Sequence, residues 1–253
     1  MQPMQPMNAA SRPEPHPRRL YLMPIETTTL TLGGSQYGMV VCYLIQMSDG
    51  KHILVDSGIP ADYQTPTGAP SHTHETNVVL RLAELGLRPD DIDLLICTHF
   101  DVDHAGYHDA FPAAELVVQR THYDVARGGH PRYAAARAHW DYPALRYRLI
   151  EGDTEIAPGV TLLETSGHAP GHQSVLVRLP QTGPVLLAVD AVVLERLFTP
   201  LRTAWPLDDD EEQLRASTRK LLDLVAHERV ALVVFGHDAE QWRSLKTAPA
   251  YYD

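Results

Sequence analysis

The chain has 253 residues, of which 44% are hydrophobic and 21% are charged, and its formal net charge at pH 7 is -11. We expect one large globular domain from residue 19 to residue 253, because a chain of this length and composition can bury a sizeable core. The acidic balance argues against nucleic acid as a partner, and no run of 18 apolar residues is present that would span a membrane. A small, weakly charged molecule is therefore the expected partner, and a homodimer is left open.

The first 18 residues are rich in Met, Pro and Gln and lack the apolar centre of a secretory signal, so we expect a disordered tail. Arg18 and Arg19 suggest a twin-arginine export signal, but the residues after them soon turn polar and lack a cleavage-type ending. Cys42 and Cys97 each lie inside an apolar run, which is typical of buried free thiols. These features favour a cytoplasmic location.

The first half of the chain begins with two β-rich runs, Met39–Ile45 and Ile53–Val55, separated by an Asp-Gly pair typical of a tight hairpin turn. We expect an antiparallel pair of strands there. Residues 61–74 carry Pro, Gly, Thr and His without periodicity, which indicates a loop. Asn77–Leu85 has apolar residues at helical spacing and is followed by Gly86 in the C-cap position, which predicts a helix.

The middle of the chain contains Asp93–Thr98, a short continuous apolar run of the kind found in strands buried on both faces. Leu116–Val118 predicts another short strand, and Thr121–Arg127 opens with Thr-x-x-Asp, which is typical of a capped helix. Residues 128–148 mix Gly, Pro, Arg, Tyr and Trp in no regular order. That segment stays unassigned and is a candidate cover for a functional site.

The second half repeats the β-rich pattern, with strands predicted at residues 160–164, 174–179 and 185–189. Asp208–Asp210 precede an amphipathic helix that runs to about Ala226, since acidic residues suit the positive N-terminal end of a helix. Val230–Phe235 predicts the last buried strand. Sheets and helices that alternate in this order, with reactive residues at strand ends, predict an α/β fold, a four-layer αβ/βα sandwich.

The densest motif follows the strand predicted at residues 93–98. It reads HFDVDHAG and places His99, Asp101, Asp103 and His104, all able to bind a metal, within six residues. Three further strand-end loops carry the same residue types, at His168, Asp190 and His237. A lone histidine or aspartate at a strand end is usually only part of a polar turn, but their combined pattern predicts a metal site, because imidazole and carboxylate are the ligands of zinc, iron and manganese.

Other polar residues near these motifs are expected to have supporting or solvent-exposed roles. Asp56, at the end of ILVDSG, is expected to orient a metal-binding histidine rather than to bind the metal, and His172 is expected to be structural. Five histidines lie in polar stretches and are predicted to be solvated: His72, His74, His108, His122 and His130.

Taken in order, the motifs resemble the metallo-β-lactamase superfamily, and within it the N-acyl-homoserine lactonases that degrade quorum-sensing signals. The similarity starts near Arg19 and runs to the C-terminus through CYLI, ILVDSGIP, THFDVDHAG, SGHAPGHQS, AVDA and VVFGHDAEQWRSLKTAPAYYD. The ending FGHDAEQ with its Pro-x-Tyr-Tyr tail is similar to the lactonase branch, whereas the histidine and aspartate motifs alone do not separate lactonases from thioesterases, nucleases or β-lactamases.

The resemblance implies two divalent metal ions, and zinc is the ion expected. The first would be bound by His99, Asp101 and His168, the second by Asp103, His104 and His237, and Asp190 would bridge both. A hydroxide shared by the ions would open a lactone ring, and Asp103, the expected catalytic residue, would pass a proton to the leaving group.

Two positions depart from the family's pattern. Asp101 stands where the family usually has a second histidine, and a carboxylate there favours iron or manganese or leaves that site weak. Val193 stands where many lactonases have a tyrosine that contacts the substrate. Either another donor, from the stretch between 122 and 147, replaces it, or the protein acts on a different ester. An acyl chain would need an apolar groove, for which Met23, Tyr37 and Phe198 are candidates, although apolar residues in such strands and loops more often belong to the core.

Three other functions remain open from the sequence. One is a glyoxalase-II-like thioesterase or a general esterase, which would use the same metal chemistry. Another is a non-catalytic ligand-binding protein that kept the scaffold after losing a metal through the change at Asp101. A flavodiiron-type oxidoreductase also carries a carboxylate in this motif, but it would need a flavin domain for which the chain has no room.

Overall fold

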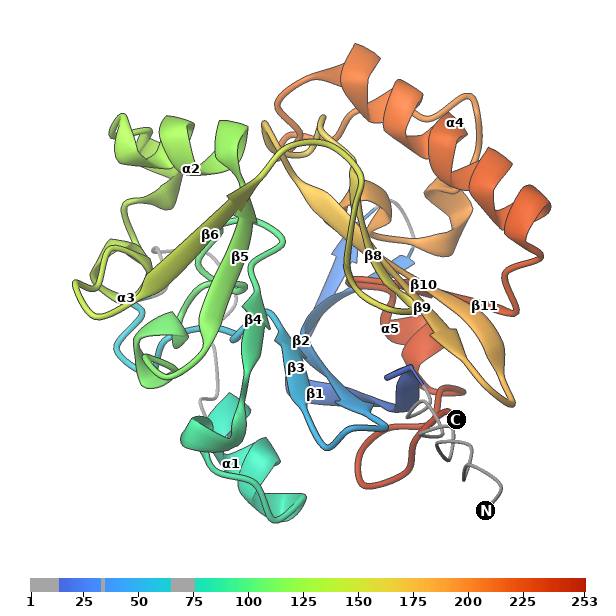
Figure 1. Ribbon diagram of the computed structural model, residues 1–253. Coiled ribbons are helices and arrows are strands. Elements are labelled where there is room, and N and C mark those ends of the chain that lie inside the picture. The colour runs from blue at the N-terminus through green and yellow to red at the C-terminus, as the bar shows by residue number, and fades with distance from the viewer. Residues whose placement is uncertain (1–13, 33–34, 65–75) are drawn as a thin grey trace, which may run out of the picture.

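The computed structural model describes residues 14–32, 35–64 and 76–253, and within them two sheets lie face to face (Figure 1). The first sheet contains, in spatial order, β1 (Pro17–Leu32), β2 (Ser35–Met47), β3 (His52–Val55), β4 (Leu94–Ile96), β5 (Glu115–Gln119) and β6 (Arg146–Ile150). The second sheet has the order β11 (Leu232–Phe235), β10 (Gly183–Val189), β9 (Gln173–Leu179), β8 (Val160–Glu164) and β7 (Thr154–Ala157).

Helices cover the outer face of each sheet. The helices α1 (Val78–Glu84), α2 (Arg120–Arg127) and α3 (Arg137–Trp140) lie outside the first sheet, and α4 (Glu211–Glu228) lies outside the second (Figure 1). The short helix α5 (Ala239–Trp242) contacts β2. The layers therefore run helix, sheet, sheet, helix, which confirms the predicted αβ/βα sandwich.

Both faces of the central strands are buried. In β2, Tyr43 and Ile45 face the other sheet, whereas Cys42 and Leu44 face the outer helices. Successive side chains of a strand point to opposite faces, so a strand that is covered on both sides reads as a continuous apolar run. This is why the sequence indicated strands here, and it also explains why Cys42 and Cys97 are buried free thiols.

The strand ends place the reactive loops together. Strands β3, β4 and β5 run parallel, and so do β10 and β11 of the second sheet. Asp56 follows β3 directly, His99 follows β4 by three residues, Asp190 follows β10, and His237 follows β11 by two. Because parallel strands end at the same edge of their sheet, these loops meet at one edge of the sandwich.

Two helix boundaries confirm the sequence analysis in detail. Asn77 caps α1, since its side chain accepts a hydrogen bond from the backbone N–H of Leu80 at 3.0 Å, and Gly86 has a φ of 75° after the helix. Asp210 caps α4 by accepting from the backbone N–H of Gln213 at 2.9 Å. Both caps satisfy N–H groups that the helix itself leaves unpaired.

Other boundaries differ from the predictions. The first helix after β5 begins at Arg120 and has Gln119 at its N-cap, so the predicted cap at Thr121 is wrong. Strands β1 and β7 were not predicted, and the unassigned segment 128–148 contains α3 and the start of β6.

The N-terminal segment extends the first sheet. Strand β1 begins at Pro17, two residues before the expected domain start, and residues 1–13 of the expected tail lie outside the described residues, as do 65–75 of the loop region. Among the described residues, no helix is both long and apolar enough to cross a membrane.

Candidate metal centre

All seven predicted metal ligands lie together at the edge where the strand ends meet. They form three overlapping groups in which the ligand atoms lie within 4.8 Å of one another: His99, Asp101 and His168; His99, His104 and Asp190; Asp103, His104 and His237. These residues come from four separate loops, after β4, β8, β10 and β11. The convergence that the sequence analysis expected is present in the fold.

The first position is the space between His99, Asp101, His168 and Asp190. The Oδ2 atom of Asp101 lies 3.3 Å from the Nε2 atoms of both His99 and His168. The Oδ2 atom of Asp190 lies 3.4 Å from Nε2 of His168 and 3.9 Å from Nε2 of His99. These four separations are close to those between the ligand atoms of a tetrahedral metal ion.

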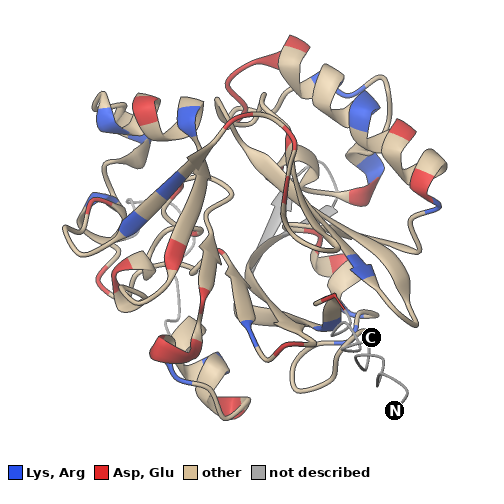
Figure 2. Cartoon of the chain, viewed as in Figure 1, with Lys and Arg blue, Asp and Glu red and all other residues tan. Residues whose placement is uncertain are grey.

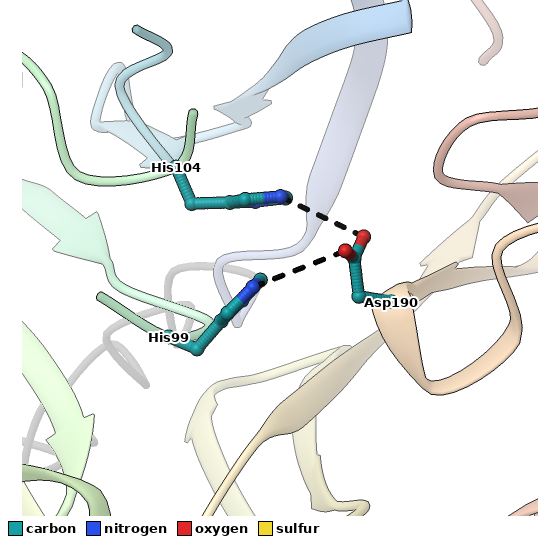
Figure 3. A group of neighbouring side chains, drawn as sticks. All are labelled: His99, His104 and Asp190. Atoms are coloured by element: carbon teal, nitrogen blue, oxygen red, sulfur yellow. Dashed lines mark ion pairs between the residues drawn. The ribbon is translucent and has the colours of Figure 1, made fainter. Parts of the chain in front are cut away.

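The second position is the space between Asp103, His104, His237 and Asp190. The Oδ2 atom of Asp103 lies 3.7 Å from Nε2 of His104 and 3.8 Å from Nε2 of His237. The Oδ1 atom of Asp190 lies 3.6 Å from Nε2 of His104 and 3.0 Å from Nε2 of His237. Nε2 of His237 also lies 3.1 Å from Oδ2 of Asp190. The Asp190 carboxylate thus lies between the two positions, and Figure 3 shows His99 and His104 pointing toward its two oxygens.

The four histidines of the two positions are all oriented in the same way. Each has its Nδ1 atom within hydrogen-bond distance of an acceptor oxygen, and these acceptors are Thr98 Oγ1 for His99 (3.0 Å), Asp56 Oδ2 for His104 (2.8 Å), Asp208 Oδ1 for His168 (2.9 Å) and the Met39 carbonyl for His237 (2.6 Å). If Nδ1 donates its proton there, the lone pair is on Nε2, which faces the centre.

The residues present fit a divalent metal ion. Ligand atoms about 2.0–2.1 Å from a tetrahedral ion are about 3.4 Å apart, close to the separations of both positions. The buried Nε2 atoms of His99 and His104 also make no hydrogen bond to any described residue. Buried polar atoms seldom lack partners, so these two nitrogens favour a bound cation.

The two central carboxyl groups are ionised. Burial would raise the pKa of Asp190, but the facing imidazoles of His237 and His104 hold that pKa well below its usual value. Burial would also raise the pKa of Asp101. The nearby His99, His168 and Arg132 outweigh burial through their charges and hydrogen bonds, so the pKa of Asp101 is well below its usual value. Both groups would therefore face a bound metal ion as anions.

Asp56 supports the second position, as predicted. Its Oδ2 atom accepts from His104 and from the Thr98 hydroxyl (2.7 Å), and its Oδ1 atom accepts from the Thr98 backbone N–H at 2.8 Å. The carboxylate therefore orients His104 directly, and it orients His99 through the Thr98 hydroxyl.

Two residues of the site were not identified from the sequence. Arg132 donates to Asp101 through Nε (2.7 Å) and Nη2 (2.6 Å), and Nη2 also lies 2.7 Å from Nε2 of His168. Asp208, expected only to favour the start of a helix, orients His168. Both residues are distant in sequence from their partners, and residues 128–148, which include Arg132, offered no periodicity.

Gly236 allows Asp190 to reach the centre. A Cβ atom at position 236 would lie 2.9 Å from both Oδ1 of Asp190 and the backbone oxygen of Val189. These separations are too short for a side chain, so the glycine of the FGHD motif is required by close approach rather than by turn geometry.

The prediction of five solvated histidines is only partly correct. His130 is exposed, but His108 and His122 are fully buried, so the prediction is wrong for these two, and His72 and His74 lie outside the described residues. His122 is buried because both ring nitrogens have partners, the backbone N–H of Phe100 (2.7 Å) and the carbonyl of Pro170 (2.7 Å).

Two further expectations concern the substrate side of the site. Val193 is buried in the core between the second sheet and α4. Met23 is fully buried in the core beneath the outer helices, so it cannot line an open groove, and that prediction is wrong. Phe198 packs against Phe235, with ring centroids 5.6 Å apart, and the side chain of Tyr37 lies outside the described residues.

Comparisons with known proteins agree with this geometry. Residues 36–237 match the family model described as "Metallo-beta-lactamase superfamily". An N-acyl homoserine lactonase from Bacillus sp is 36% identical over 235 residues, covering 88% of this chain and 91% of that protein. The N-acyl homoserine lactonase AiiA of Bacillus thuringiensis subsp. kurstaki is 35% identical, covering 84% of this chain and 86% of that protein.

Solved structures give the same result. A quorum-quenching N-acyl homoserine lactone lactonase aligns with a TM-score of 0.81 and 34% identity, over 94% of this chain and 99% of that chain. An N-acyl homoserine lactone hydrolase with N-hexanoyl-L-homoserine, its product, bound at the catalytic metal centre aligns with a TM-score of 0.80 and 33% identity, over 94% and 100% of the two chains. With this extent of similarity, and with the motif residues in place, the chain belongs to the metallo-β-lactamase superfamily.

Proposed function

We propose that the protein is a metal-dependent hydrolase that opens the lactone ring of N-acyl homoserine lactones, with two divalent ions held at the first and second positions. The observation that carries this proposal is the pair of four-atom ligand sets that share Asp190. The named relatives, which align over most of both chains, supply the substrate class.

The ligand sets suggest which ions would bind. The second position offers two imidazoles and two carboxylates, which suits zinc. The additional carboxylate of Asp101 gives the first position a harder set of ligands, so iron or manganese is an alternative there. Ions bound in this way would lower the pKa of water toward neutrality and would polarise a substrate carbonyl group.

Asp103 is the proposed catalytic residue. Its side chain is 27% exposed, whereas those of His104 and His237 are 3% and 4% exposed, so Asp103 lies at the open side of the cluster. A carboxylate in that place can take the proton released during attack on the lactone and give it to the departing alkoxide oxygen. The product is the ring-opened N-acyl homoserine.

The charge distribution fits a neutral substrate. Figure 2 shows Lys and Arg scattered over separate helices and strands of the described chain rather than along one element. A thioesterase of the glyoxalase II type would be expected to have a basic surface for its charged thiol carrier, and a nucleic-acid-binding protein would be expected to have one for phosphates. The scattered Lys and Arg therefore favour the lactonase, and the thioesterase or general esterase is kept as the alternative function.

A substrate panel tests the proposal. Ring opening of N-hexanoyl homoserine lactone releases acid, so its rate can be followed with a pH indicator, beside a thioester and a simple aliphatic ester. We expect the lactone to have the highest kcat/KM, and we expect a chelator to abolish the activity and added metal to restore it. A higher kcat/KM for the thioester would reject the lactonase assignment, and activity that survives complete metal removal would reject the metal-dependent mechanism.

A further inference from the structure

Arg132 uses two of the atoms that a metal ion in the first position needs. Its Nη2 atom lies 2.6 Å from Oδ2 of Asp101 and 2.7 Å from Nε2 of His168. Arginine only donates hydrogen bonds, so in the tautomer that carries its proton on Nδ1, which faces Asp208, the Nε2 atom of His168 accepts from Arg132. The lone pair of His168 that would bind an ion is thus engaged by Arg132.

The lone pair cannot serve both partners at once. An imidazole nitrogen has one lone pair, which lies in the plane of the ring, and a metal ion and an N–H donor both approach along that direction. Asp101 is less restricted, because each carboxylate oxygen can accept more than one bond. An ion can therefore fill the first position with its full set of protein ligands only after Arg132 has released His168.

The guanidinium group of Arg132 is also held from its other side. Its Nη1 atom donates to the carbonyl oxygens of His168 (2.9 Å) and Leu207 (2.8 Å) and to Oδ1 of Asp209 (3.0 Å). With the bonds to Asp101 and His168, each of its three nitrogens has a partner, and the side chain is only 16% exposed. Arg132 is therefore a fixed part of the site rather than a mobile surface side chain.

Arg132 also opposes a cation electrostatically. Arginine stays protonated in proteins, so its guanidinium group is a permanent cation beside Asp101. Its charge neutralises Asp101, which weakens the attraction of the first position for a second cation. At the second position, the Nε2 atoms of His104 and His237 face the carboxylates of Asp103 and Asp190 instead of an arginine.

We propose that Arg132 makes the two metal positions unequal, so that the second position fills first and the first position fills only at a higher metal concentration. The inference rests on the proposed two-ion site and deepens it. Arg132 is thus a positioning residue that acts through Asp101 and His168. At limiting metal, the protein carries one ion, bound by Asp103, His104, His237 and Asp190.

Metal titration of the wild-type chain tests this order of filling. Metal-free protein is loaded with Mn²⁺ and examined by electron paramagnetic resonance, and Zn²⁺ binding is measured by calorimetry. We expect the spectrum of an isolated Mn²⁺ ion up to one equivalent, a coupled pair only beyond it, and two Zn²⁺ dissociation constants that differ by tenfold or more, which corresponds to about 1.4 kcal/mol. A coupled pair at one equivalent, or two equal constants, would overturn the inference.

The variant Arg132→Met identifies the residue responsible. It should tighten the weaker Zn²⁺ constant by tenfold or more and leave the tighter constant unchanged. The matched control is Arg137→Met, because Arg137 lies on the same segment and binds Asp141 at 3.1 Å, outside the site. That variant should retain both wild-type constants. A weaker constant that is unchanged or worse in a folded Arg132→Met protein contradicts the inference.

The outcomes separate this inference from the proposed function. Two equal Zn²⁺ constants together with lactone hydrolysis reject only the role of Arg132. A protein that binds no metal rejects both. If Arg132→Met does not fold, Arg132→Gln, which removes the charge but keeps a polar side chain, takes its place in the same comparison.

Discussion

Asp56 and His104 form a buried pair in which the histidine Nδ1 atom lies 2.8 Å from the carboxylate Oδ2 atom. Neither side chain is more than 3% exposed. Asp56 has a φ of 58°, in the left-handed region that few residues other than glycine, asparagine and aspartate adopt readily. This carboxylate is therefore held at the end of β3, where it fixes the ring of one proposed metal ligand.

The substitution Asp56→Asn should weaken metal binding at the second position. Asparagine tolerates the left-handed backbone and has nearly the same shape, but it loses the negative charge that orients His104. We expect the tighter metal dissociation constant to rise about 10-fold to 100-fold, as is usual when such a partner is lost. Calorimetric titration measures it, and Asp49→Asn, in an exposed turn, is the control. An unchanged metal dissociation constant would show that Asp56 does not support metal binding at the second position.

The substitution Asp103→Asn tests the proton-transfer role. An amide oxygen can still bind an ion weakly, but it cannot carry the proton to the leaving group. We expect kcat for the lactone to fall about 10²-fold to 10⁴-fold, the range of general acid-base catalysis. Metal content must be measured on the same sample, and Asp109→Asn serves as a control outside the site. If kcat falls only in proportion to lost metal, Asp103 is a ligand and not a proton carrier.

Burial of His122 predicts a dependence of stability on pH. Burial lowers the pKa of His122 from 6.5 to about 4, against a smaller opposing effect of the Pro170 carbonyl. Because the folded state keeps the ring neutral in this window and the unfolded chain protonates it, acidification from pH 6.5 to 4 favours unfolding. This single group contributes a loss of roughly 3 kcal/mol over the window.

The variant His122→Gln isolates that effect. Urea unfolding of the metal-free proteins at pH 7 and pH 4.5 should show that the free energy of unfolding falls more for the wild type than for the variant. Metal-free protein is required because the proposed ligands also titrate. His130→Gln, which removes an exposed ring on the same segment, should follow the wild type. A His122→Gln protein that loses as much stability as the wild type would show that His122 is protonated in the folded state.

Much of the fold could be predicted from the sequence because local patterns carry it. The apolar runs that became β2, β4 and β10 reflect strands covered on both faces, and Asn77 and Asp210 carry the chemistry of helix caps. Strand β1 was missed because its register shifts break the regular alternation. The prediction of a cap at Thr121 was wrong because the helix already begins at Arg120, directly after β5.

The candidate site could be predicted as a set of ligands, but not as a network. His99, Asp190 and His237 are recognisable because each follows a buried strand, where a polar side chain costs free energy unless it has a partner. Nothing in the sequence links Arg132 to Asp101, 31 positions away, or Asp208 to His168, 40 positions away. The burial of His122 was likewise invisible, because its partners are backbone atoms of Phe100 and Pro170.

Anomalous X-ray diffraction from crystals grown with excess Zn²⁺ tests the central claim most directly, because it locates the ions without reference to activity. The account predicts two peaks, one on each side of the Asp190 carboxylate, with His104 and His237 around one and His99 and His168 around the other. Data collected at limiting Zn²⁺ should retain only the peak beside His104 and His237. A protein with no peak at Asp190 in excess metal would contradict the account.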